Sequence, residues 1–458
     1  VLEVVLTQRQ GVPMAGVPYH ALDTYLPRLL EAGIKVAIAD QMEDPRQAKG
    51  IVQRAVARII TPGTVVESGV LDPRQGNYLA ALCHRQERFG LAWLDLSTGD
   101  FRVSELDGAE ALAIELHRIQ AAECLLPATL HDEWERSSSF PVMPRRITWT
   151  PLEDWRFAAD AAGDLLRRHF GVHSLDGFGC RDLPLAVGAA GAILYYAREN
   201  LRRDVGHLRR LTTCAPEATM ALDAATQRHL ELVEPQPGGR REGTLLHVLD
   251  QTATPMGARL LREWLLRPLR DRIAIAARHG AVATLHEDPV LLAELREHLA
   301  GIRDLERITA RLNLGSAHAR DLLALARGLA AVPQLQQLLA ACDQPLLGEL
   351  RDRLRPLPEL AATITATITD DPPLALTEGG LIRPGCNAQL DELRSAATDG
   401  KGWIAALQAR EQERTGIKSL KVRFNKVFGY FIEVTKANLH LVPDDYRRRR
   451  IEPSGFQH

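Results

Sequence analysis

The spacing between apolar residues changes along the chain, and these changes limit the folds that it can adopt. Up to about residue 103, short β-branched runs such as 35–39 and 56–61 alternate with Gly and Pro, which is typical of mixed α and β structure. Strand-like and helix-like segments keep alternating to about residue 212, which suggests a second α/β unit. From about 220 to 414, apolar residues recur at helical spacing. We therefore expect an almost wholly helical region, with helices over 291–312 and 319–339.

The end of this region predicts one long helix followed by a β-hairpin. Between 388 and 414, apolar or small residues recur at alternating spacings of three and four, and Gly416 follows as a candidate C-terminal cap. Such a helix would be about 40 Å long at ~1.5 Å per residue, and its narrow apolar stripe is typical of a lever that leaves a domain body. From 420 the spacing changes to two, so Lys421, Arg423 and Asn425 share one strand face. We expect a hairpin with one basic and one apolar face.

The composition excludes several classes of protein. Of the 458 residues, 45% are hydrophobic and 25% are charged, as in ordinary globular proteins, and the length suggests about three domains. No stretch approaches the ~18 apolar residues that a membrane helix needs. The six cysteines form no Cys-x-x-Cys pair, which argues against a zinc ribbon or disulfide scaffold and for a reducing compartment. The chain starts without Met, in what reads as the middle of a strand, so we expect a piece of a longer protein.

Basic residues concentrate toward the C-terminal end. The formal net charge of the chain is −2, yet residues 415–458 hold nine Lys or Arg against four Asp or Glu. A local basic excess on a near-neutral chain suggests one element that contacts a polyanion. The alternative, a solvated charged face without a partner, remains open at this point.

Most catalytic motifs are absent from the sequence. It has no phosphate-binding Gly-x-x-x-x-Gly-Lys-Ser/Thr loop, no His-Glu-x-x-His and no Gly-x-Ser-x-Gly. One segment, 94–101, is nevertheless compatible with an enzyme, because Asp95 on a strand and Asp100 after a turn could begin a two-metal nuclease site. The simpler interpretation, which we favour, is a hairpin turn with Asp95 on the polar face.

Several segments together resemble one family. They include Pro-Met-Ala-Gly-Val-Pro-Tyr-His-Ala at 13–21, Arg-Ile-Ile-Thr-Pro-Gly-Thr at 58–64 and Gly-Phe-Gly at 177–179. Further matching segments lie at 36–41, 94–101, 220–232, 252–271, 304–307, 371–385 and 420–435. In this order and over nearly the whole chain, they are similar to the MutS family of DNA mismatch repair proteins.

The resemblance implies four domains in order along the chain. These are an α/β mismatch-recognition domain (1–61), an α/β connector with an RNase H-like fold (62–213), an all-α core with the lever helix (214–414), and the start of a clamp (415–458). Two family features are not found in the sequence: the Phe-x-Glu that wedges beside a mismatched base, expected upstream, and the ATPase domain, expected downstream. The family's clamp pattern is also lost after about Arg448.

The resemblance also implies where DNA would bind. In the recognition domain, the matching DNA-facing residues are Arg9 and a loop of Met14, Ala15 and Gly16. In the clamp, the expected phosphate contacts are Lys421, Arg423, Asn425, Lys426 and Lys436. Phosphate contacts give affinity without reading sequence, whereas mismatch detection depends on the lower cost of kinking a poorly stacked step.

The implied function is DNA mismatch repair, by binding duplex DNA with mismatched or looped-out bases. The chain itself is expected to be no enzyme and to hold no metal; ATP and Mg²⁺ are expected only for the intact protein. A homodimer is likewise expected of the intact protein and only weak association of this chain. A MutL-type partner is expected to bind at the connector or the core. The protein is expected in the bacterial cytoplasm, associated with the nucleoid, and no membrane is expected as a partner. The alternatives are a metal-dependent nuclease using Asp95 and Asp100, and a helical scaffold that does not bind DNA.

Overall fold

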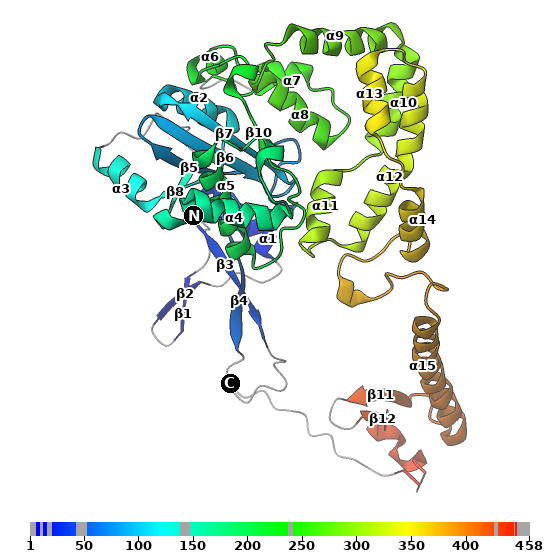
Figure 1. Ribbon diagram of the computed structural model, residues 1–458. Coiled ribbons are helices and arrows are strands. Elements are labelled where there is room, and N and C mark those ends of the chain that lie inside the picture. The colour runs from blue at the N-terminus through cyan, green and yellow to red at the C-terminus, as the bar shows by residue number, and fades with distance from the viewer. Residues whose placement is uncertain are drawn as a thin grey trace. The chain divides into compact units, whose positions relative to one another are not determined.

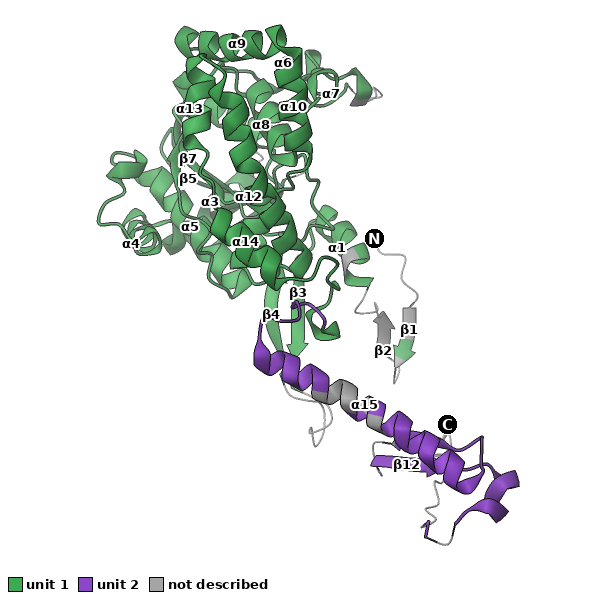
Figure 2. Cartoon of the chain, turned by 90° about the vertical axis from the view of Figure 1, so that its right-hand side faces the viewer, with its two compact units in different colours: residues 1–379 green, residues 380–458 purple. Residues whose placement is uncertain are grey.

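A computed structural model describes residues 6–9, 12–15, 21–42, 53–137, 147–236, 241–425, 429–443 and 445–446. By its internal contacts the chain divides into two compact units, Val1–Gly379 and Gly380–His458, which Figure 2 shows in different colours. Sheets and helices are both present (Figure 1). The expected mixture of α and β structure is confirmed.

Short strands and one helix make up the described N-terminal residues. They are β1 (Leu6–Arg9), β2 (Val12–Ala15), α1 (Leu22–Glu31), β3 (Val36–Gln41) and β4 (Arg54–Ile60). β1 pairs antiparallel with β2, and β3 pairs antiparallel with β4. α1 buries Leu26 and Leu30 in a small core that also contains Ile60 and Val65.

A larger sheet with helices on both faces follows. Its elements are β5 (Tyr78–Arg85), β6 (Arg88–Asp95), β7 (Asp100–Asp107), α2 (Gly108–Ile119), β8 (Glu123–Pro127), α3 (Ala128–Ser137), β9 (Thr148–Leu152), α4 (Ala159–Phe170), α5 (Pro184–Leu201) and β10 (Thr212–Thr213). The strand order is β10-β7-β6-β5-β8-β9. β5, β6 and β7 are antiparallel neighbours, whereas β8 and β9 are added in parallel to β5, and β10 in parallel to β7.

Each face of this sheet has its own core. Leu79, Ala81 and Cys83 belong to the core that includes α4 and α5, whereas Ala80 and Leu82 belong to the core that includes α2 and α3. A strand that helices cover on both faces needs apolar residues at every position. This explains why β5 shows no alternation of polar and apolar residues.

Glycines allow helix α5 to approach both the sheet and helix α4 closely. A β-carbon added to Gly90 of β6 would lie 2.1 Å from the carbonyl carbon of Leu185. One added to Gly191 of α5 would lie 2.3 Å from the Cβ of Ala162 in α4. Both distances are far shorter than van der Waals contact, so a larger residue at either position would force the backbones apart.

Two half-buried histidines connect the end of α4 and the segment after α5 to their surroundings. His169 Nε2 lies 2.8 Å from the carbonyl oxygen of Leu208, and its Nδ1 accepts a hydrogen bond of 2.8 Å from Arg198. His207 Nε2 lies 2.9 Å from the carbonyl oxygen of Leu96. Burial lowers the pKa of both histidines, so both rings are neutral near pH 7.

We expect the protein to lose stability as the pH falls from 7.5 to 5.5, in part through His169. Its pKa lies below the ordinary 6.5 in the folded chain, so the unfolded chain takes up the proton first. The stability that depends on the neutral ring is therefore complete above pH 6.5 and is lost below it. In His169→Gln, whose amide can make both hydrogen bonds without titrating, urea unfolding should show a smaller pH dependence than in the parent. The exposed His286, changed to Gln, is the control; an unchanged pH dependence in His169→Gln would contradict this expectation.

The described residues from 224 to 379 are organised mainly as helices, as predicted. They are α6 (Ala224–His229), α7 (Leu245–Leu249), α8 (Pro255–Leu266), α9 (Arg272–Glu287), α10 (Pro289–Ala300), α11 (Leu305–Asn313), α12 (Ala319–Ala340), α13 (Pro345–Arg353) and α14 (Pro358–Thr367). Leu291, Leu295, Leu335 and Leu347 are part of the core between α9, α10, α12 and α13. Among the helices that the structure describes, none is long and apolar enough to cross a membrane.

The prediction of a single helix over 291–312 is wrong, because this segment contains two helices. α10 ends at Ala300, and Gly301 follows it. Asp304 then begins α11, since its side chain accepts a hydrogen bond of 3.3 Å from the backbone N–H of Arg307. An aspartate at this position stabilises a helix start, because its carboxylate replaces a missing backbone acceptor.

The second unit consists of a long helix followed by a hairpin. α15 (Ala388–Thr415) is capped as predicted by Gly416, whose φ of 71° lies in the left-handed region. β11 (Lys421–Asn425) then pairs antiparallel with β12 (Gly429–Glu433), and a 3₁₀ helix follows at Lys436–Leu441. The predicted order of helix and hairpin is confirmed.

Candidate nucleic-acid interface

Helix α15 contacts strand β11 of the hairpin, and side chains on both hairpin faces are exposed, including Phe424 and Tyr430 on the Val422 face. Gln408 Oε1 accepts a hydrogen bond of 2.9 Å from the backbone N–H of Val422, and the Leu420 side chain is fully buried. Because successive residues of a strand face opposite sides, Lys421 and Arg423 share the face opposite Val422. Both are exposed, so the hairpin presents two basic side chains to solvent.

The basic face also carries an acid, Glu433. Lys421 lies directly opposite Glu433 in the strand register, and Arg423 Nε lies 2.7 Å from Glu433 Oε2. The two side chains of this ion pair are 57% and 49% exposed, so solvent screens the pair and another anion can replace it at low cost. Sequence reasoning missed Glu433 as a member of this face, although the alternation from Lys421 across a short turn was a usable signal.

The other predicted clamp residues are only partly placed by the structure. Lys436 is exposed at the start of the 3₁₀ helix that follows β12. Asn425 ends β11, but its side chain lies outside the described residues, as does all of Lys426. The structure thus brings Lys421 and Arg423 together on one face, and phosphate binding by the five residues stays a prediction.

The predicted recognition-domain residues fall on the first two strands. Arg9 ends β1, and Met14 and Ala15 end β2, so the prediction that Met14 and Ala15 belong to a loop is wrong. The side chains of these three residues, and Gly16 entirely, lie outside the described residues. Their contact with DNA therefore remains a prediction.

The two aspartates considered for a nuclease are engaged within the protein. Asp95 is 1% exposed and accepts hydrogen bonds from the Ser97 hydroxyl at 2.6 Å and from the backbone N–H of Asn77 at 3.1 Å; burial raises its pKa. Asp100 pairs with Arg102 at 2.8 Å. The turn between β6 and β7 is confirmed, but Asp95 is buried and does not lie on a polar face as predicted. In the described part of the chain, the side chains close enough to share a metal ion lie on α3 and include neither aspartate.

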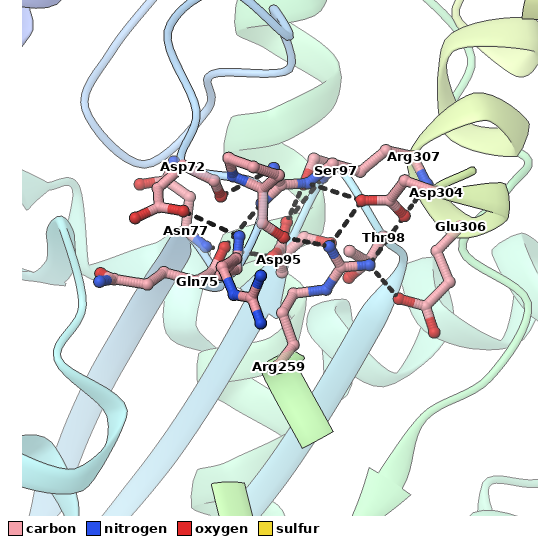
Figure 3. A network of polar contacts seen from close by, with 12 residues as sticks. Asp72, Gln75, Asn77, Asp95, Ser97, Thr98, Arg259, Asp304, Glu306 and Arg307 are labelled. Atoms are coloured by element: carbon pink, nitrogen blue, oxygen red, sulfur yellow. Dashed lines mark hydrogen bonds and ion pairs between the residues drawn. The ribbon is translucent and has the colours of Figure 1, made fainter. Parts of the chain in front are cut away.

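Asp95 instead belongs to a network of polar contacts between the large sheet and the helical region. Figure 3 shows this junction network, in which the labelled residues are Asp72, Gln75, Asn77, Asp95, Ser97, Thr98, Arg259, Asp304, Glu306 and Arg307. Arg307 of α11 is 4% exposed and donates to Ser97 Oγ at 3.1 Å. The same guanidinium donates to the backbone oxygens of Asp72 at 2.9 Å and Gln75 at 2.7 Å. One arginine therefore connects α11 to the β6–β7 turn and to the segment before β5.

Helix α8 contributes further ion pairs at the same boundary. Arg259 donates to the two carboxylate oxygens of Asp304 at 2.6 and 2.8 Å and to Glu306 at 2.6 Å. Glu263, one turn later, pairs with Arg102 of β7, with one contact of 3.0 Å. Since Arg259 and Asp304 are largely buried, loss of Arg259 would leave the Asp304 carboxylate without its closest counterion.

A second buried polar site lies at the start of β8, around Glu123. This glutamate is fully buried and accepts hydrogen bonds from Thr150 Oγ1 and Tyr196 Oη, both at 2.7 Å, and from the backbone N–H of Gly63 at 3.1 Å. The Thr61 hydroxyl is a fourth donor. Burial and the nearby carboxylate raise the pKa of Tyr196, which keeps it protonated as a donor. The site joins the segment after β4 to β8, β9 and α5, and sequence reasoning gave no sign of it.

Comparison with known proteins adds to this geometry. Residues 1–69, 77–209 and 225–440 match the sequence models of MutS domain I, MutS domain II and MutS domain III, respectively. The chain is similar to proteins named DNA mismatch repair protein MutS from Symbiobacterium thermophilum (48% identity), Halothermothrix orenii (44%) and Solibacter usitatus (46%), in each case over 98% of this chain. It spans about half the length of these relatives, namely 52%, 50% and 52%. The order of the three matched domains and the identity over almost the full chain show that the chain belongs to the MutS family.

Proposed function

We propose that this chain provides DNA-binding and connecting domains of a DNA mismatch repair protein. The observation that carries the proposal is the exposed pair Lys421 and Arg423 on one face of the hairpin, which lies within the match to MutS domain III. Phosphate contacts through such a face give affinity without sequence preference. This property suits a protein that has to bind DNA of any sequence around a mismatch. The name of the relatives supports the same function.

The proposed domain layout is a recognition domain at 1–61, a connector at 62–213, a core with a lever helix at 214–414 and the start of a clamp at 415–458. An RNase H-like fold of the connector is supported by its strand order, in which antiparallel β5, β6 and β7 are extended by parallel β8 and β9. The engagement of Asp95 and Asp100 in internal contacts favours a connecting role over nuclease activity.

ATP and Mg²⁺ do not fit the residues of this chain, because its sequence has no Gly-x-x-x-x-Gly-Lys-Ser/Thr loop. We place ATP hydrolysis, the catalytic activity of the intact protein, outside residues 1–458. The main homodimer contacts are placed outside these residues as well. A MutL-type partner would bind at the connector or the core, and the intact protein would act in the bacterial cytoplasm.

The proposed function predicts weak, salt-sensitive binding of duplex DNA through the hairpin. Each phosphate contact contributes about 0.9 to the slope of log K against log salt. The double variant Lys421→Glu/Arg423→Glu should therefore lower the slope by about 1.8 in fluorescence anisotropy titrations with a labelled duplex. The matched control is Arg296→Glu/Arg303→Glu, which makes the same charge change at two exposed arginines of the helical region. Absence of duplex binding by the parent chain at low salt would contradict the function, and equal slopes for the two double variants would exclude the hairpin.

A further inference from the structure

A second group of basic residues lies far from the hairpin in the sequence. Six arginines belong to the end of α4, the end of α5 and the segment after α5. This arginine cluster comprises Arg168, Arg198, Arg202, Arg203, Arg209 and Arg210. The nearby acids are mostly neutralised, since Glu199 pairs with Arg156 at 2.7 Å and Asp164 pairs with Arg167. Asp204 is then the remaining acid among them, so the cluster is strongly positive on a chain whose net charge is −2.

The fold brings the three segments of the cluster together through His169. Its ring connects Arg198 of α5 to the carbonyl oxygen of Leu208, at 2.8 Å on each side. Arg168 precedes this histidine on α4, and Arg209 follows Leu208 directly. Because Arg198 donates to Nδ1, the ring hydrogen is on Nε2 and the ring is neutral. His169 therefore holds the segments in place without adding to their charge.

The arginines divide into those with internal contacts and those without. Arg202 donates to the backbone oxygen of Val56 in β4 at 2.6 Å, and Arg203 donates to the backbone oxygen of Leu314. Arg168, Arg209 and Arg210 are exposed, and in the described part of the chain no carboxylate pairs with them. These three guanidinium groups can therefore bind an external anion without breaking an internal ion pair.

We propose that the arginine cluster binds the phosphates of duplex DNA, as a second contact besides the hairpin. This inference rests on the proposed function. Guanidinium groups match phosphate geometry and lose little hydration on binding. The contact of Arg202 with Val56 makes the cluster continuous with β4, where Arg54 is also exposed.

The surroundings of the cluster favour DNA over an acidic protein. Protein interfaces have an apolar or aromatic centre. Among the described residues between 156 and 219, no large apolar side chain is exposed, and the neighbouring Trp155, which is 58% exposed, contacts Tyr195 edge-on and the Arg156 guanidinium. One aromatic side chain beside six arginines leaves charge as the main feature of this surface, which suits a polyelectrolyte whose binding is driven by counterion release.

The test compares Arg209→Glu/Arg210→Glu with the control Arg296→Glu/Arg303→Glu, using the full chain and a labelled duplex over a salt series. We expect the cluster variant to lower the salt slope by about 1.8 and the control to leave it unchanged. Arg209→Lys/Arg210→Lys should keep the slope, since both charges remain. Because the glutamate variant could also affect folding, Arg209→Gln/Arg210→Gln is measured as well and should lose the same slope.

The outcomes separate this inference from the proposed function. Suppose that the parent chain binds duplex and that Lys421→Glu/Arg423→Glu weakens this binding. If the glutamate and glutamine variants of Arg209 and Arg210 then behave like the control, the cluster is not a DNA contact, and only this inference is overturned. The same holds if those variants lose binding to an acidic polypeptide such as polyglutamate but not to DNA. If the parent chain binds no duplex at low salt, the result contradicts both the proposed function and this inference.

Discussion

Replacing Arg307 with alanine is expected to lower the free energy of unfolding of this chain by about 3–5 kcal/mol, as for a buried charge that loses its partner. The guanidinium is 4% exposed and donates to the Ser97 hydroxyl and to the backbone oxygens of Asp72 and Gln75. Its removal takes a donor from the backbone oxygen of Gln75 and from the buried Ser97 hydroxyl, whereas the Asp72 oxygen still accepts from the backbone N–H of Gln75 at 3.3 Å. It also removes the positive charge that offsets the buried carboxylate of Asp95. Burying unpaired polar and charged groups is among the few mechanisms that give losses of this size.

The loss of stability should appear in urea unfolding as a lower midpoint. Arg303→Ala is the matched control, because Arg303 is an exposed arginine four residues earlier and its loss should cost within about 0.5 kcal/mol. Arg307→Lys should fall between the two, since an ammonium keeps the charge but cannot reach three acceptors in the same fork geometry. A midpoint for Arg307→Ala equal to that of Arg303→Ala would show that the network does not stabilise the junction.

Short-range patterns predicted the parts of this fold that depend on neighbouring residues. The apolar spacing before Thr415 and the glycine at 416 predicted helix α15 and its cap, and the change to a spacing of two predicted the hairpin. The turn between β6 and β7 was also predicted. These features depend on residues within a few positions of one another, where spacing and conformational preference act directly.

The polar sites could not be predicted in this way, because their partners are distant in the sequence. Ser97 and Arg307 are 210 residues apart, and Thr61 and Glu123 are 62 apart. Asp95 illustrates the consequence: on its own strand it reads as a polar residue facing water, but the helical region covers it. Even within the hairpin, Glu433 becomes part of the basic face only through the strand register.

Glu123→Ala is expected to be the second large effect, with a loss of about 3 kcal/mol or more in the free energy of unfolding. The carboxylate is fully buried and accepts four hydrogen bonds, from Thr61, Gly63, Thr150 and Tyr196. Alanine removes the acceptor that Gly63, Thr150 and Tyr196 share, while the Thr61 hydroxyl keeps its contact with the Thr64 hydroxyl at 3.0 Å. Glu123→Gln should cost less, about 1–2 kcal/mol, because its remaining oxygen can still accept from Gly63 while the hydroxyls of Thr150 and Tyr196 turn to accept from its amide.

Hydrogen exchange at the backbone amide of Gly63 provides a local measurement of the same site. This amide donates to Glu123 at 3.1 Å, so its exchange should speed up in Glu123→Ala and much less in Glu123→Gln, before any global loss of structure. Glu110→Ala, which removes an exposed glutamate from α2, is the control and should change neither the midpoint nor this exchange rate. If Gly63 exchanges equally fast in Glu110→Ala and Glu123→Ala, then Glu123 does not hold the segment after β4 against the sheet. A graded series, with alanine worst and glutamine intermediate, is expected because the site depends on the number of acceptors that Glu123 supplies to fixed donors.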